Sequence, residues 1–173
     1  MVGAFLAVMI IYILIMGVSF GAAIVTVIAN WKLNEKAGEP GWHSIVPFLC
    51  VYTRAKIGGV IKYFWRMLIT MGINFGASLI LGVIMMVITI VTATSSDSTG
   101  FGVFFFSLFY AVVNLGLSCV MWYFWFKIEQ AFARVFGKDT GYAFGLIFLP
   151  FVFNPLLVWG RNQAEYIPPV NIE

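Results

Sequence analysis

Charged residues are scarce in this sequence of 173 residues. They make up 10% of the chain, whereas hydrophobic residues make up 62%, and soluble domains carry roughly 25% charged residues. The mean hydropathy of +0.99 agrees with this imbalance. The composition therefore predicts an all-α integral membrane protein that forms a single membrane domain over residues 1–173, with no length left for a soluble enzymatic domain.

Side chains that bind metals or support nucleophilic catalysis are also few. His43 is the only histidine, and Cys50 and Cys119 lie far apart inside apolar segments. These residues exclude a histidine cluster for a metal ion and a Ser-His-Asp site, so we expect no catalytic residue, metal or cofactor. We interpret the cysteines as small packing residues and His43 as an interfacial residue beside Trp42, with pH sensing as the alternative for the histidine.

Four hydrophobic runs cover most of the chain, at about residues 2–29, 67–92, 101–126 and 142–159. At about 1.5 Å per residue the first three are long enough to cross about 30 Å of hydrocarbon. The first run lacks the basic start of a signal peptide, which predicts an uncleaved span. The fourth contains Pro150 and Pro155 and is either a kinked span or a re-entrant segment. We expect about four transmembrane helices.

Basic residues set the expected orientation. They are concentrated at 30–66 and 127–141, whereas the connection 93–100 contains none. Cytoplasmic loops carry an excess of Lys and Arg. We therefore expect two inner loops at 30–66 and 127–141, an outer turn at 93–100 and an N-terminus outside. If the fourth run spans, the C-terminus also lies outside.

The end of the third run carries interfacial signals. Trp122 and Trp125 precede Lys127, as expected of aromatic anchors at the inner boundary. Apolar residues then recur at helical spacing from Ile128 to Phe136. This pattern predicts an amphipathic helix near 127–136 that lies on the inner surface or extends the third span.

Two spans carry matching polar pairs four residues apart: Asn74 with Ser78, and Asn114 with Ser118. A hairpin joined at 93–100 would bring these pairs together, with interhelical hydrogen bonds worth about 0.6 kcal/mol each. We interpret them as intramembrane polar packing, with a lining for a transported solute as the alternative.

Two blocks of the sequence carry a family resemblance. They read WKLNEKAGEPGWHSIVPFLCVYTRAKIGG (31–59) and FARVFGKDTGYAFGLIFLPFVFNPLLVWG (132–160). They resemble the signatures WKxxxKAGxPGWxxxIP and FGKxxGYxxGLxFLPFxFxP of a family of small bacterial multi-span membrane proteins of unknown function. The resemblance implies a multi-pass protein of the bacterial cytoplasmic (inner) membrane. The region between the blocks is longer than the hairpin expected from the family.

The blocks supply the candidate interaction surface on the inner face. Its residues are Trp31, Lys32, Lys36, Gly38, Pro40, Gly41, Trp42, Pro47, Gly137, Lys138, Gly141, Pro150 and Pro155. In each block a basic segment leads to a glycine pair, an aromatic residue and an apolar stretch broken by Pro-Phe, which suggests a degenerate internal repeat. In the first block we expect a short interfacial or re-entrant helix near 42–53 that returns at Arg54 and Lys56.

Some members of that family are labelled signal peptidase I, and the residues test this label. The chemistry needs a serine nucleophile and a lysine base together on the outer side. Ser95, Ser96 and Ser98 are expected outside, but every lysine is expected inside. The topology therefore disfavours the peptidase, and we expect no enzymatic activity.

The leading functional hypothesis is a non-enzymatic accessory or interaction subunit of a larger membrane complex. Its expected partners are the lipid bilayer and other membrane protein subunits. Nucleic acid is not expected, because the basic residues lie in the loops that set topology. The alternative is a small transporter or channel for a lipid or apolar solute, with the proline-broken segments lining its path.

Overall fold

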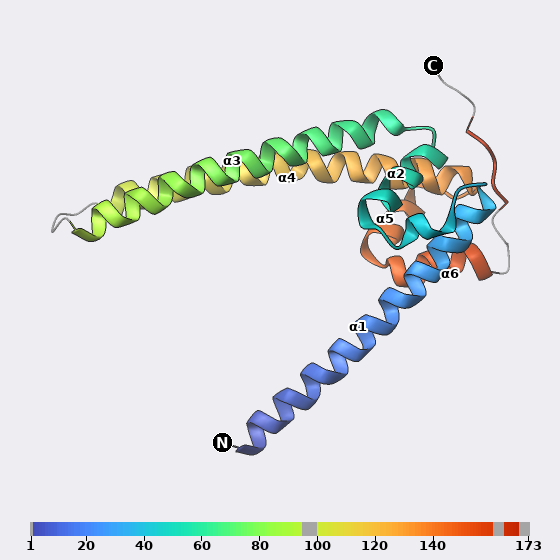
Figure 1. Cartoon of the computed structure of the whole chain (residues 1–173), viewed down its shortest axis with the longest axis horizontal. Coiled ribbons are helices and arrows are strands. Elements are labelled where there is room, and N and C mark those ends of the chain that lie inside the picture. The colour runs from blue at the N-terminus through green and yellow to red at the C-terminus, as the bar shows by residue number, and fades with distance from the viewer. Residues whose placement is uncertain (1, 95–99, 161–164, 170–173) are drawn as a thin grey trace. The chain divides into compact units, whose positions relative to one another are not determined.

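The all-helical fold is confirmed by a computed structural model, which describes residues 2–94, 100–160 and 165–169 (Figure 1). Of the residues in these ranges, 87% are helical and none is in a strand. The chain divides into two compact units. Unit 1 comprises Met1–Ile61 and Ile128–Glu173, and unit 2 comprises Lys62–Lys127.

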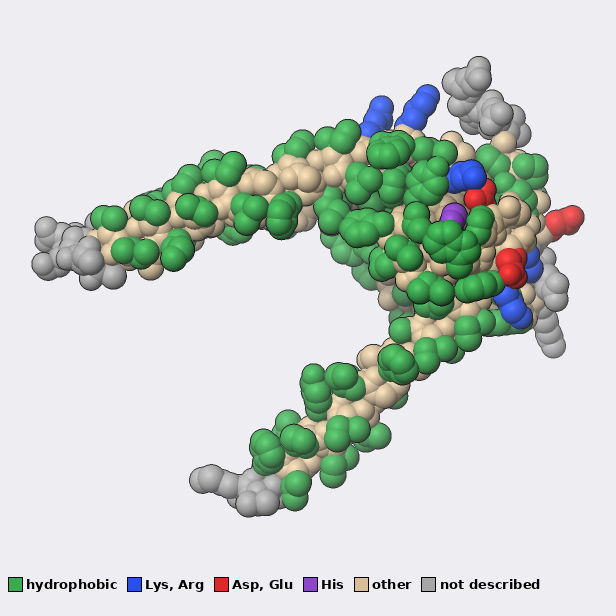
Figure 2. Space-filling model, in the orientation of Figure 1, with side chains coloured by type: hydrophobic (Ala, Val, Ile, Leu, Met, Phe, Trp, Pro, Cys, Tyr) green, Lys and Arg blue, Asp and Glu red, His purple; other side chains and the backbone are tan. Residues whose placement is uncertain are grey.

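Among the described residues, three helices are long and apolar enough to cross a membrane: α1 (Val2–Lys36), α3 (Ile61–Thr94) and α4 (Gly100–Val135). The side chains of residues 5–20 of α1 are all exposed, and Figure 2 shows this stretch covered with hydrophobic groups. An exposed apolar surface of this size is unfavourable in water, so these helices identify a multi-pass membrane protein. Of the predicted outer turn at 93–100, residues 95–99, with Ser95, Ser96 and Ser98, fall outside the described residues.

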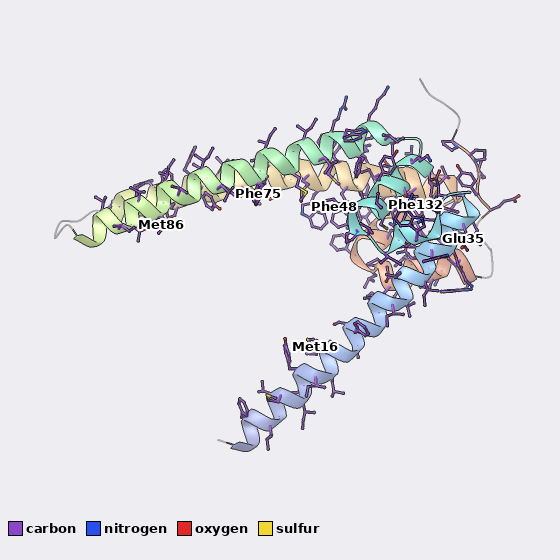
Figure 3. All side chains as sticks on the ribbon, in the orientation of Figure 1. Met16, Glu35, Phe48, Phe75, Met86 and Phe132 are labelled. Atoms are coloured by element: carbon purple, nitrogen blue, oxygen red, sulfur yellow. The ribbon has the colours of Figure 1, made fainter. Side chains whose placement is uncertain are left out.

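Residues 127–135 continue the third span without a break as the last turns of α4. Ile128, Phe132 and Ala133 are fully buried. Figure 3 shows Phe132 among the packed helices of unit 1. This segment therefore extends the span, one of the two expected arrangements, and packs inside unit 1.

The run at 142–159 forms two short helices, α5 (Thr140–Phe148) and α6 (Pro150–Trp159). The break is at Leu149, whose φ of −134° and ψ of 57° are not helical. Pro150 causes it, because the residue before a proline avoids the helical region and a proline is best placed in the first turn of a new helix. With 9 and 10 residues, each helix is only about 15 Å long or less.

The short segment of the first block forms a 3-10 turn, η1 (Gly41–Ser44), and α2 (Pro47–Ile57). Val46 is extended, with φ −95° and ψ 115°, and Pro47 takes the first helical position. The helix α2 continues through Arg54 and Lys56 to Ile57, four residues beyond the expected end at 53, and the return at these two residues stays a prediction.

The long helices α1 and α4 end in the same way. Gly38 and Gly137 have φ values of 78° and 68°. Beyond them the amide of Glu39 donates to the carbonyl of Asn34 at 2.9 Å, and the amide of Lys138 donates to that of Ala133 at 3.0 Å. This is the Schellman pattern, in which glycine takes a left-handed conformation to close the helix. Each ending is followed by a short helical segment and then a helix that begins with proline.

Unit 2 is built from α3 and the first part of α4. The Ser78 hydroxyl donates to the Asn114 side-chain oxygen at 3.0 Å, which joins the two helices. It also lies 3.4 Å from the Asn74 oxygen on its own helix. Ser118 lies one turn beyond Asn114 and is half-buried.

Candidate functional site: a buried polar cluster

Four helices of unit 1 each place one polar side chain in a common buried cluster. The residues are Asn30 on α1, Arg54 on α2, Glu129 on α4 and Asn154 on α6, and all are buried. The Arg54 Nη1 donates to Glu129 Oε2 in a buried ion pair. Its Nη2 donates to Asn30 Oδ1 at 2.7 Å and to Asn154 Oδ1 at 2.9 Å. Arg54 is therefore the centre that joins the two signature blocks.

The surroundings of Arg54 hold it in the charged form. Burial by itself lowers the pKa of this guanidinium, but the Glu129 carboxylate and the Cys50 sulfur outweigh burial and raise the pKa overall. The Phe132 ring lies against the guanidinium, 4.7 Å from its central carbon to the ring centroid. A buried charge is tolerated only when it is paired and hydrogen-bonded, and Arg54 meets both conditions.

Asn154 leaves one donor unsatisfied. Its Oδ1 faces Arg54, which can only donate, so the amide nitrogen must point the other way. This Nδ2 is fully buried and has no hydrogen-bond partner among the residues that the structure describes. A buried donor without an acceptor costs about 1–3 kcal/mol, which offsets part of the stabilisation from the contacts of Arg54.

Further polar contacts surround the cluster and join neighbouring segments. Asn34 donates to the Ser44 hydroxyl at 3.1 Å, and His43 Nδ1 lies 2.8 Å from the Thr53 hydroxyl. In the second block Gln130 donates to the Thr140 hydroxyl at 2.9 Å. The contact with Thr53 therefore holds His43 against α2.

Three glycines allow backbone and rings to approach closely. A Cβ on Gly41 would overlap the Trp31 indole, and one on Gly145 would overlap the Phe153 ring. A Cβ on Gly58 would lie 2.9 Å from the Ala131 Cβ and 3.2 Å from its backbone. Glycine at these positions of the signature blocks therefore has a packing explanation.

The residues of the predicted interaction surface all lie in unit 1, but they differ in exposure. Gly41 is buried beneath Trp31, so it supports the surface without forming part of it. Lys138, Pro150 and Pro155 are half-buried. The exposed members are Trp31, Lys32, Lys36, Gly38, Pro40, Trp42, Pro47, Gly137 and Gly141.

Sequence reasoning missed the buried cluster. Arg54 was interpreted as a loop cation, because basic residues between spans normally set topology. Glu129 fell on the expected amphipathic helix, and Asn30 was placed at the start of an inner loop. The available signal was an acidic residue within an otherwise apolar helix surface, which requires a cation somewhere else in the chain.

Within the described residues, no group of three or more His, Cys, Asp or Glu side chains is arranged to hold a metal ion. The side chains of the buried cluster form hydrogen bonds and an ion pair with one another. No family model, curated protein or solved structure matches the chain. Its function is therefore argued from unit 1 itself.

Proposed function

We propose that this protein is a non-enzymatic accessory or interaction subunit of a larger membrane complex, in the inner membrane of a bacterium. One observation carries the proposal: Arg54 of the first block binds Asn154 of the second block inside unit 1, while Trp31, Trp42, Lys32 and Lys36 of the first block are exposed. A surface of this kind is suited to binding. Aromatic residues are enriched at interfaces between proteins.

The first block offers the most continuous exposed surface. Four large apolar residues are exposed from η1 to the start of α2, including the connection between them: Trp42, Ile45, Val46 and Phe48. Lys32 and Lys36 are exposed at the end of α1, from which η1 follows. An apolar patch next to lysines fits a membrane protein partner with an apolar contact and an acidic edge at the inner face.

The basic residues favour one orientation of the chain in the membrane. Lys and Arg at the C-terminal ends of α1 and α4 favour these helix ends on the cytoplasmic side, with the N-terminus outside. Within unit 1, η1 and α2 form the short interfacial or re-entrant element of the first block. A fourth complete span is not part of this proposal, because α5 and α6 are separate short helices.

Copurification in a mild detergent tests the docking role. We expect the wild-type chain to copurify with a partner in a constant ratio. We expect the Trp42→Ala variant to lose that partner. Trp65→Ala is the matched control, because Trp65 lies in unit 2 with 56% exposure against 51% for Trp42. A lone, monodisperse wild-type protein, or equal loss of the partner in both variants, contradicts the proposal.

A second candidate is a small transporter or channel for a lipid or apolar solute. The break at Leu149 and the unpartnered Asn154 Nδ2 favour it, because discontinuous helices and buried polar groups occur along solute paths. Reconstitution into liposomes tests this role. Flux no greater than that of empty vesicles excludes it for the solutes assayed.

A further inference from the structure

The ends of the α5–α6 hairpin (Thr140–Trp159) both lie beside the C-terminal ends of the spanning helices. At its start, the Thr140 hydroxyl accepts a hydrogen bond from Gln130 on α4. At its end, the Trp159 ring lies 5.2 Å from Lys32 Nζ on α1. Lys32 and Gln130 lie in the last two turns of helices that run to Lys36 and Val135. The hairpin therefore begins and ends at the same level, which is that of the C-terminal ends of α1 and α4.

The segment after the hairpin stays at this level. The Ile167 amide donates to the Val135 carbonyl at 2.8 Å, and the Tyr166 ring packs on Phe136 at 6.0 Å between centroids. A Cβ on Gly59 would lie 3.0 Å from Pro169. Residues 166–169 are thus bound to the ends of α4 and α2.

The tip of the hairpin is apolar and exposed. Phe148 is 70% exposed, and Leu149 and Phe151 are also exposed large apolar residues. The buried face of α6, with Asn154, Leu157 and Val158, is turned into unit 1. The hairpin therefore has one face bound to its own unit and an apolar tip without a covering group among the described residues.

The backbone at the bend satisfies much of its hydrogen bonding internally. The Leu149 amide donates to Gly145 at 2.8 Å, and the amides of Val152 and Phe153 both donate to the Leu149 carbonyl at 3.0 Å. Pro150 has no amide hydrogen to satisfy. Tyr142 donates its hydroxyl to the Phe153 carbonyl at 2.7 Å, which joins the two arms. Irregular backbone enters hydrocarbon only when its polar groups are paired in this way.

We propose that α5–α6 is a re-entrant hairpin whose apolar tip is bound by the acyl chains of the inner leaflet, and that the chain after it returns to the cytoplasmic face. Arms of 9 and 10 residues reach about 15 Å, half of the roughly 30 Å hydrocarbon layer. Acyl chains are the favoured occupant because the exposed side chains of the tip are large and apolar, as are those of α1, which belongs to the same unit and is long and apolar enough to span a membrane. The inference does not depend on a protein partner.

Side-specific labelling in inside-out and right-side-out vesicles tests the topology. In a full-length background with Cys50→Ala and Cys119→Ala, we expect Glu165→Cys and Lys138→Cys to react with a membrane-impermeant maleimide from the same, cytoplasmic side. Labelling of the two positions from opposite sides overturns the proposal. If the background does not fold, protease accessibility of a tag after Glu173 in the otherwise wild-type chain gives the same answer: cleavage only from the outside overturns it.

Depth-dependent quenching tests the occupant. A fluorophore on Phe148→Cys is expected to be quenched most by lipids brominated deep in their acyl chains, and one on Lys138→Cys most by headgroup quenchers. Efficient quenching of the Phe148 label by aqueous iodide contradicts acyl-chain contact. So does bromine quenching that disappears as the protein-to-lipid ratio rises, which would identify a second copy of the chain as the occupant. A failed partner assay for Trp42 leaves both measurements unaffected.

Discussion

Unit 1 and unit 2 bring apolar helices together by different means. In unit 2 the two long helices meet with a neutral hydrogen bond between half-buried Ser78 and Asn114. In unit 1, four helices meet around a buried charged pair, Arg54 with Glu129. The neutral contact tolerates small shifts along a hairpin. A guanidinium with three side-chain partners fixes the position of every helix that supplies one.

The difference teaches where specificity is placed in this chain. Short helices such as α2, α5 and α6 bury little apolar area by themselves, and in lipid the hydrophobic effect does not drive helices together. Hydrogen bonds to Arg54 supply the missing selectivity, because an alternative packing would leave a charge unpaired. The spanning hairpin of unit 2 is long enough to be held in place by the bilayer itself.

The largest expected effect is the loss of Arg54. Arg54→Met leaves the Glu129 carboxylate buried without its cation, so we expect the free energy of unfolding in detergent to fall by about 3–5 kcal/mol. Adding Glu129→Met removes the orphan charge and is expected to recover most of that loss. Chemical denaturation followed by circular dichroism measures both variants. A single variant that loses less than about 1 kcal/mol shows that the cluster does not hold unit 1 together.

Next in size is a methyl group at Gly58. The added Cβ meets Ala131 and the α4 backbone, which cannot move aside, so Gly58→Ala should cost about 1–3 kcal/mol. Gly72→Ala in unit 2 is the control, since nothing lies within 4 Å of its Cβ position. The same unfolding assay applies. Equal losses in the free energy of unfolding for Gly58→Ala and Gly72→Ala would contradict tighter packing around Gly58 in unit 1.

The two Schellman endings should respond alike. Gly38→Ala and Gly137→Ala force alanine into a left-handed conformation at positions without steric crowding. We expect each to lower the free energy of unfolding by about 1 kcal/mol. Thermal unfolding of both variants measures this. A clear loss at one glycine and none at the other argues against equivalent roles in the two blocks.

A smaller effect is expected in unit 2. Ser78→Ala removes the hydroxyl that bonds Asn114 and should cost about 0.6 kcal/mol. A double-mutant cycle with Asn114→Ala measures the coupling. A coupling of several kcal/mol would remove the contrast between the two units.

The smallest effect concerns the ion pair between exposed Lys56 and half-buried Glu39, whose charged atoms lie 2.6 Å apart. The hydrogen bond from Lys56 to Glu39 raises the pKa of Lys56. The raised pKa means that the pair stabilises the fold fully below the ordinary lysine pKa of about 10.4. The contribution disappears as the pH rises through the raised value. Lys56→Met should change thermal stability little near neutral pH, and a large loss would make this pair part of the essential framework.

The sequence predicted the helices better than the contacts between them. Long apolar runs placed α1, α3 and α4, because length and hydropathy decide which segments cross a membrane. Pro150 marked the break in the fourth run. The role of Arg54 was not predictable from its position, since a loop cation and the centre of a buried cluster look alike until Glu129 and Asn154, 75 and 100 residues away, are brought beside it.

The spacing of these partners along the chain has a consequence for synthesis. Asn30 precedes Arg54 by 24 residues, but Glu129 and Asn154 follow it by 75 and 100. At about 5–20 residues per second, the ribosome needs roughly 4–20 s to supply the missing partners. During that interval α2 carries a cation without its carboxylate and stays in contact with water. The cluster of unit 1 can therefore close only after Asn154 has been synthesised, late in the synthesis of the chain.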